Sequence, residues 1–417
     1  MSIAKILLYP FTRIGNEASV FNTYPREMRI LLITNMIYAF VLPVIDIFVG
    51  AYIMRNSANP SMVAFYQLTV YTGIPFTFLI NGFLLNRIKI AHLYSFGMLL
   101  SGVSLLAMML LQQISFAGVG IAGFLMGSSF GFFWANRDYL ALNTTTDETR
   151  NYYYGVETFF YTLTYIIVPF FIGIFIARAE TANWFGGDAN NAYKLVTALV
   201  FLLTIISTIV VQQGDFKNPK QKKFIYWKFD KLWHKMLFLA SLKGMGQGYL
   251  VTAPAILIMT LVGNESELGT IQSICGIITA LILYVLGRIS KPEHRIHIFS
   301  FGIIIFAVGA LTNSILFSAT GVIIFMLTKI LFQPLHDLAY FPIQLKVIDT
   351  VAKKEDRNEF AYIFNHEFGL YAGRAFGLLL FIVLHKYISE VFALKYALLT
   401  IALIQLIAIP VARRISK

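Results

Sequence analysis

Three basic residues lie inside long apolar stretches in the second half of the chain: Lys243, Lys329 and Arg374. A charge in the hydrocarbon core of a bilayer costs at least about 2.5–3.5 kcal/mol, so each needs a partner or a ligand. A cluster of cations without protein partners would suit an anionic solute, because an unpaired buried charge is otherwise very costly. Gln247 adds an uncharged polar group to the path of such a solute.

Two acid–histidine pairs occupy the same region, His336–Asp337 and His366–Glu367. They are candidates for proton coupling, because histidine titrates near neutral pH. The alternative is that these acids form buried salt bridges with the three cations, although the acids are expected nearer the cytoplasm than the cations. A metal site is disfavoured, since the acid–histidine spacings match no recognised ligand motif.

The first half of the chain contributes Asp46, which is either a coupling carboxylate with a pKa raised by burial or a residue facing the outer vestibule. Glu367 is preferred as the coupling group, since it adjoins a histidine and shares a helix with Arg374, and Asp46 is the next candidate. Trp134, Tyr161 and Asn35 are expected near the solute path.

A second charge cluster is expected near the cytoplasmic end of the first half, formed by Arg137, Asp138 and Glu157 with Arg87 in a neighbouring loop. A structural ion-pair cluster is the favoured interpretation, and a coupling site or a moving gate is the alternative.

All of these residues belong to twelve apolar segments, each long enough to cross a hydrocarbon core of about 30 Å as a helix of roughly 20 residues. Hydrophobic residues make up 58% of the chain and charged residues 13%, with a mean hydropathy of +0.70, so the chain is an all-α polytopic membrane protein. The segments are 30–54, 62–85, 91–112, 115–141, 153–177, 192–212, 234–262, 268–288, 294–316, 319–346, 359–385 and 390–412.

Lysine and arginine residues between these segments fall mostly on one side, which holds both termini. The opposite loops hold only Arg55, Arg178, Lys194, Lys386 and Lys395. By the positive-inside rule, both termini are cytoplasmic, in the plasma (inner) membrane. The same asymmetry explains the net charge of +12 without any binding to nucleic acid. The opening residues 3–15 are expected to lie along the membrane surface.

The longest polar stretch, DFKNPKQKKFIYWKFDKLWHK at 215–235, divides the chain into two six-helix halves, 1–212 and 234–417, joined by a basic cytoplasmic linker, 213–233. An acidic pair followed by Arg-Asn opens a helix in each half, at Asp147-Glu148-Thr149-Arg150-Asn151 and at Glu355-Asp356-Arg357-Asn358. Corresponding segments in two halves are typical of a duplicated transporter.

With this layout the sequence resembles the major facilitator superfamily over about residues 28–414. The family's loop motif between helices 2 and 3 is matched by Gly82, Arg87 and Lys89, with Asn86 in place of its acid, and Gly287, Arg288 and Lys291 follow helix 8 in the same way. The resemblance implies two pseudo-symmetric six-helix bundles around a central solute site.

Two helices are expected to be important for movement. The run Lys243-Gly244-Met245-Gly246-Gln247-Gly248, followed by Pro254, is expected to weaken its helix. Gly369, Gly373 and Gly377 have the four-residue spacing of close helix packing.

We therefore expect a monomeric secondary transporter that moves a small, anionic organic solute by alternating access, coupled to protons, with export slightly favoured. A flippase for a lipid or lipid-linked headgroup, contacting membrane lipids through the same fold, is the alternative. No nucleotide-binding loop, catalytic zinc pattern or Gly-x-Ser-x-Gly motif appears, which disfavours an enzyme, and no cofactor is expected.

Overall fold

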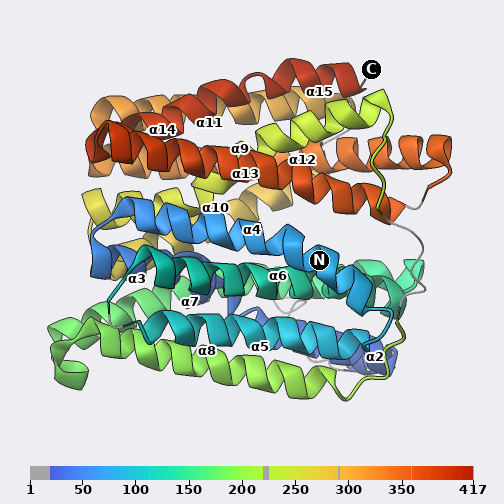
Figure 1. The fold of residues 1–417 in the computed structure, drawn as a ribbon, viewed down its shortest axis with the longest axis horizontal. Helices are drawn as coiled ribbons and strands as arrows, with labels where there is room; N and C mark the ends of the chain where they lie inside the picture. The colour runs from blue at the N-terminus through green and yellow to red at the C-terminus, as the bar shows by residue number, and fades with distance from the viewer. Residues whose placement is uncertain (1–18, 112, 219–224, 290–291, 358, 417) are drawn as a thin grey trace, which may run out of the picture.

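The computed structural model describes residues 19–111, 113–218, 225–289, 292–357 and 359–416. Within these ranges the chain is helical and contains no strand, and its long helices lie side by side (Figure 1). The predicted surface segment 3–15 falls outside the described residues, as do Lys220, Lys222 and Lys223 of the basic linker.

The first half comprises α2 (Arg26–Tyr38), the π-helical turn η1 (Val44–Phe48), α3 (Val49–Ser57), α4 (Pro60–Leu84), α5 (Ile90–Met109), α6 (Phe116–Thr144), α7 (Asp147–Thr181) and α8 (Ala189–Val211). The second half comprises α9 (Lys231–Leu261), α10 (Glu265–Ile289), α11 (Arg295–Leu316), α12 (Ala319–Glu355), α13 (Glu359–Tyr387), α14 (Glu390–Gln405) and α15 (Ala408–Ser416). Short 3₁₀ turns occur at Trp184–Gly187 and Pro292–His294.

The predicted spans follow these helices in order, with α2, η1 and α3 in the first span and α14 and α15 in the last. The largest differences are that α7 begins at Asp147 instead of 153 and that α12 continues to Glu355 instead of 346. In the described residues, eleven helices are long and apolar enough to cross a membrane, with α14 and α15 counted together. The first predicted span is not among these eleven, because it is broken into α2, η1 and α3, each too short to cross a membrane alone.

Short polar side chains fix where several helices begin. Asn59, Ser115, Asp188, Ser318 and Ser389 each accept a hydrogen bond from a backbone N–H in the first turn that follows. Such caps satisfy donors that have no partner within the helix.

Asp230 caps α9 in the same way and also forms an ion pair with Lys354, at 2.5 Å. The hydrogen bond from the Lys354 ammonium and the cap bond lower the pKa of the Asp230 carboxyl below its usual value. The cap therefore connects the start of α9 to the end of α12.

Helices α2–α8 form one bundle and α9–α15 the other. In Figure 1 the first bundle is drawn mostly below the second. The bundles meet chiefly where α7 packs against α10 and α4 packs against α13. The α2 helix and the last turn of α15 lie toward the same end of the molecule, which we call the termini end (Figure 1). The boundaries 1–212, 213–233 and 234–417 remain predictions.

The break in the first span surrounds Pro43. Proline has no N–H to donate and disrupts the helical ladder, and the chain continues through the wider π-helical turn η1 before α3 begins. The prediction of one continuous helix over 30–54 was wrong in this respect. The turn places Asp46 in its middle.

Helix α9, in contrast, is continuous through its glycine run, so the backbone is not unwound there, and the expected weakening of this helix stays a prediction. The glycines are explained by close packing. A Cβ atom on Gly244 would overlap the carbonyl oxygen of Leu370 on α13, and one on Gly373 would overlap that of Ser241 on α9. The predicted close packing of α13 through its glycines is therefore confirmed.

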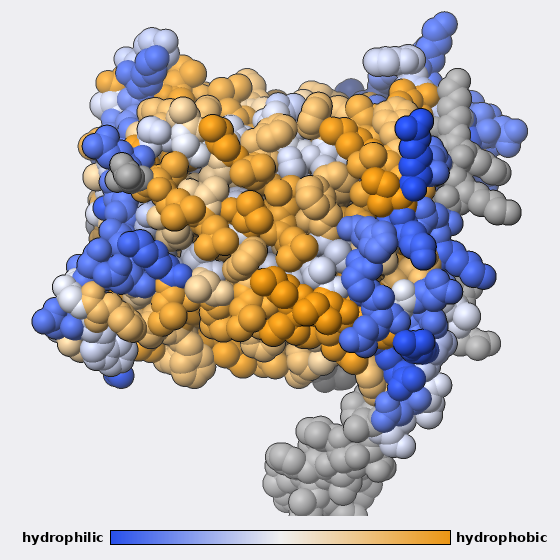
Figure 2. Space-filling view, turned by 60° about the horizontal axis from the view of Figure 1, so that its bottom comes forward, coloured by the Kyte–Doolittle hydropathy of each residue, from blue (hydrophilic) through white to orange (hydrophobic). Residues whose placement is uncertain are grey.

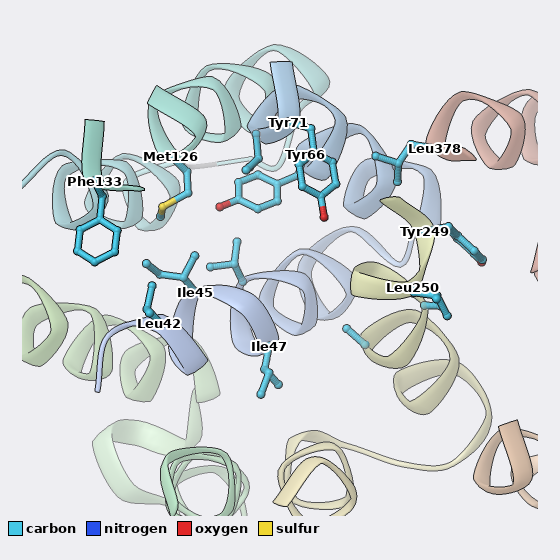
Figure 3. Packing of buried hydrophobic residues seen from close by; sticks show 14 of the residues in the cluster. Leu42, Ile45, Ile47, Tyr66, Tyr71, Met126, Phe133, Tyr249, Leu250 and Leu378 are labelled. Atoms are coloured by element: carbon cyan, nitrogen blue, oxygen red, sulfur yellow. The ribbon is translucent and has the colours of Figure 1, made fainter. Parts of the chain in front are cut away.

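The surface has the pattern of a membrane protein. Figure 2 shows a band of apolar side chains between two hydrophilic ends. Figure 3 shows the core beneath it, where Leu42 and Ile45 of the first span face Met126 of α6 and Tyr71 of α4. The core therefore continues up to the helix break that carries Asp46.

Candidate functional site

A cavity of about 420 Å³ lies between the two halves. Its walls come from η1 and α7 in the first half and from α9, α10 and α12 in the second. This volume is in the range of small-molecule sites. We call it the large cavity, and its main polar and charged side chains are Asp46, Tyr161, Tyr165, Gln272, Lys329 and Gln333.

Asp46 and Lys329 contribute opposite charges to the large cavity from opposite halves of the protein. The Asp46 carboxylate accepts a hydrogen bond from the Tyr165 hydroxyl on α7 and interacts electrostatically with Lys329. Among the described residues, Lys329 has no carboxylate within 4 Å. The prediction of a cation without a protein ion pair therefore holds for Lys329.

A smaller pocket of about 80 Å³ adjoins the large cavity and shares Val251, Lys329 and Gln333 with it. Its other polar walls are Lys243, Gln247, His336 and Asp337, and we call it the small pocket. The Lys243 Nζ lies 2.8 Å from Asp337 Oδ1, and His336 Nδ1 lies 3.1 Å from the same oxygen.

Lys243 and Arg374 are therefore not unpaired cations, and that expectation was wrong for both. Arg374 Nη1 lies 3.5 Å from Glu367, and its Nε and Nη2 donate to Gln247 Oε1 at 3.1 and 2.9 Å. The acids were expected at a different depth from the cations. Lysine and arginine side chains are long enough to reach carboxylates one or two turns away.

Tyr340 connects the two acid–histidine pairs. Its hydroxyl lies 2.6 Å from His366 Nε2, and its ring stacks on that of His336 with centroids 5.4 Å apart. Lys243 Nζ lies 4.2 Å from the centre of the same ring. Glu367 is held by Arg374 and is not among the residues that line the two cavities, unlike Asp46.

The first-half cluster forms as expected around Arg137, which pairs with Glu157 and, at 2.6 Å, with Asp138. Asn35 donates to Glu157 at 2.6 Å, so it belongs to this cluster. Trp134 also belongs there, with Arg137 5.7 Å from the centre of its ring.

Of the aromatic residues expected near the solute path, Tyr161 lines the large cavity and Trp134 is not among its lining residues. Arg87 lies exposed in the loop between α4 and α5, where no ion pair joins it to a described residue of the cluster.

A polar network that was not expected from the sequence lies at the end opposite the termini. Arg55 donates to Glu265 through Nε and Nη2 at 2.6 and 2.8 Å, and to Glu180 at 2.9 and 3.1 Å. Tyr193 donates to Glu265 at 2.9 Å. We call these residues the Arg55 clamp. The available signal was that Arg55 is one of the few basic residues on that side of the membrane.

The clamp joins the two halves. Glu265 begins α10 in the second half and its side chain has no solvent exposure, whereas Arg55, Glu180 and Tyr193 belong to the first half. Just below it, a Cβ atom on Gly269 of α10 would overlap the carbonyl oxygen of Pro169 on α7. At this end the halves are therefore closed tightly over the large cavity.

Comparison with solved structures supports the fold. The nucleoside transporter NupG matches with a TM-score of 0.64 and 12% identity, covering 94% of this chain and all of that one. The POT family transporter PepTSo matches with a TM-score of 0.71 and 9% identity, covering 94% and 98%. At these identities the likeness concerns the fold alone.

Sequence comparison gives the family. An uncharacterized protein of Bacillus subtilis (strain 168), YqgE, is 22% identical over 375 residues, which cover 86% of this chain and 83% of that protein. The family model of the major facilitator superfamily matches residues 31–378. The chain belongs to the major facilitator superfamily, and it is a transporter and not an enzyme.

Proposed function

We propose that the protein is a proton-coupled secondary transporter of a small organic solute that carries an anionic group. The proposal rests on one observation: Lys329 lines the large cavity and has no ion-pair partner among the described residues. An anionic group of the solute would supply the missing countercharge. Because one chain forms the whole cavity, we propose that a monomer is sufficient for transport. We also propose that the protein lies in the plasma (inner) membrane with both termini in the cytoplasm.

Asp46 is the better candidate for the coupling carboxylate. Glu367 already has Arg374 as a partner, whereas Asp46 faces the large cavity and the field of Lys329. When Asp46 is ionised, it partly neutralises Lys329 and competes with the solute for it. When Asp46 is protonated, this competition ends, so the proton and the anion assist each other's binding by the same factor.

This positive linkage favours symport of proton and anion, not the export that the sequence suggested. Both ligands bind the same state and would cross together as the halves rock about the site. A proton gradient directed into the cell would therefore drive uptake of the solute.

The experiment is a binding screen followed by transport of the solute that it identifies. Purified protein is screened by thermal shift against small organic anions, and the best ligand is then offered to proteoliposomes under an imposed pH gradient. We expect Lys329→Gln to abolish binding. We expect Asp46→Asn to retain solute exchange and to lose pH-driven accumulation, because it cannot exchange a proton.

Unchanged affinity in Lys329→Gln would contradict the anion site, and pH-driven accumulation by Asp46→Asn would exclude Asp46 as the coupling group. Headgroup-labelled lipid is measured in the same vesicles. Lipid translocation without transport of any soluble anion would favour the flippase alternative instead.

A further inference from the structure

We propose that the small pocket is a subsite for a carboxylate of the transported solute, with Gln247 as a donor that Arg374 holds in place. The inference rests on the proposed function and specifies how the solute lies: its carboxylate in the small pocket and its body in the large cavity. Lys329 lines both spaces, at the point where they join.

The sizes of the two spaces support this division. A water-sized group needs at least about 10–15 Å³, so the small pocket of about 80 Å³ has room for roughly five to eight such groups. That is ample for a carboxylate and too little for a whole organic molecule of ordinary size. The large cavity of about 420 Å³ has room for the rest of a small organic molecule and offers Tyr161, Tyr165 and Met326 to contact it.

The orientation of Gln247 supplies the main chemical argument. Its Oε1 accepts both hydrogen bonds from Arg374, at 3.1 and 2.9 Å. The amide nitrogen therefore points away from Arg374, and its two N–H groups are the atoms that Gln247 can present to the small pocket that it lines. Arg374 is not a direct ligand in this arrangement. It is a positioning residue, because its two donors fix which end of the amide faces the pocket.

The remaining walls have the same polarity. An ammonium group has three N–H donors, and Lys243 uses one of them to bind Asp337 at 2.8 Å, while its Nζ also lies 4.2 and 3.9 Å from the ring centres of Tyr340 and Phe341. Lys329 lines the same pocket, and none of its three donors has a carboxylate acceptor among the described residues. Asp337 offsets one of the two lysine charges, which leaves a net single positive charge when Asp46 of the adjoining large cavity is protonated. A pocket with this charge and these donors matches a monoanionic carboxylate better than a doubly charged phosphate.

The test uses two matched glutamine substitutions. Gln247→Glu keeps an acceptor for Arg374 and replaces the N–H donors with a carboxylate oxygen, so a merely structural role of Gln247 would survive. Gln272→Glu makes the same change in the large cavity, outside the small pocket. Both variants and the wild type are titrated by thermal shift with a panel of small monocarboxylates and with the neutral amide of each acid.

We expect a monocarboxylate, and not its amide, to stabilise the wild type. Gln247→Glu should weaken its binding by about 30-fold or more, since a charge-assisted hydrogen bond is replaced by repulsion. Gln272→Glu should weaken it by less than about threefold, because the added charge is farther from the carboxylate. If Gln247→Glu does not fold, Gln247→Met, which removes the donors without adding charge, takes its place.

Equal weakening by both variants, an unaffected Gln247→Glu, equal binding of acid and amide, or no binding by any monocarboxylate would each overturn the subsite. The failure of the subsite can be told from that of the proposed function. A ligand that needs Lys329 and ignores Gln247 contradicts the subsite alone. An anion that ignores Lys329 contradicts the proposed function as well.

Discussion

Glu157 is almost completely buried, with 1% of its side chain exposed, and the Arg137 side chain beside it is 13% exposed. Hydrogen bonds from Asn35 and Tyr153, at 2.6 and 3.3 Å, satisfy the carboxylate further. All four residues belong to the first half of the protein. A rocking motion between the halves would leave these bonds intact, so we interpret the cluster as a brace inside one half and not as a gate.

This interpretation predicts different costs for the two acids that bind Arg137. Glu157→Gln should lower the free energy of unfolding by about 3–5 kcal/mol, because it leaves a buried guanidinium without its main countercharge. Asp138→Asn should change it by at most about 1 kcal/mol, since the Asp138 side chain is 66% exposed. Denaturant titration of the purified variants measures both. Equal losses of unfolding free energy in the two variants would contradict the interpretation that the buried Glu157–Arg137 pair is the stabilising part of the cluster.

The sequence was informative about the depth of each charge and uninformative about its partner. Lys243 and Lys329 both stand in long apolar segments and look alike there. They differ because Asp337 reaches Lys243 from another helix while no described carboxylate lies within 4 Å of Lys329. Which faces of which helices meet depends on helix rotation and packing, which a single sequence does not specify.

At the scale of elements, the contact between α9 and α13 is close enough to exclude side chains at several positions. Gly373 faces the backbone of Ser241, whereas Gly155 on α7 has no heavy atom of another element within 4 Å of where a Cβ would lie. Backbones approach this closely only through small residues, and packing of this kind holds helices together in a bilayer.

We therefore predict that Gly373→Ala lowers the melting temperature in detergent by several degrees, because its methyl group forces α9 and α13 apart. Gly155→Ala is the matched control and should leave the melting temperature unchanged or raise it slightly, since alanine favours the helix by about 1 kcal/mol. If the Gly373→Ala protein is as stable as the wild type, α9 and α13 can move apart enough to admit a methyl group without a loss of stability.

Helix positions were predictable because a helix that crosses a bilayer requires a long apolar segment, and such segments can be recognised directly in the sequence. The irregular element was not predictable from local propensity. The glycine run of α9 looked weak and is regular, because packing against α13 supports it. The first span looked regular and is broken at Pro43, the one local signal that could have indicated the π-helical turn around Asp46.

For the whole molecule, the Arg55 clamp is an ion-paired connection between the halves at the end opposite the termini, and no other is found among the described residues. Opening that end must separate Arg55 from Glu265, a carboxylate with no solvent exposure. The bond from Arg55 to Glu180 lies within the first half and can persist. The clamp therefore biases the protein toward the state that is closed at this end.

We predict that Glu265→Gln shifts the protein toward opening at this end, because the cross-half pair loses its charge. Cys275, the single cysteine, lines the large cavity and reports access to it. In sealed vesicles, an impermeant maleimide added on the side of Arg55 should modify Cys275 several-fold faster in Glu265→Gln than in the wild type. Glu180→Gln, the control within one half, should not change the rate. Acceleration by both would mean that the clamp acts through Arg55 alone.

The opposite charges of Asp46 and Lys329 have a consequence for the membrane voltage. The empty cavity holds one positive and one negative charge that cancel. Loaded with a proton on Asp46 and a monoanion on Lys329, it is again neutral. Moving one elementary charge across 100 mV takes about 2.3 kcal/mol, and neither form carries such a charge through the field. A carrier built in this way would run on the pH and solute gradients alone and would be indifferent to the potential across its membrane.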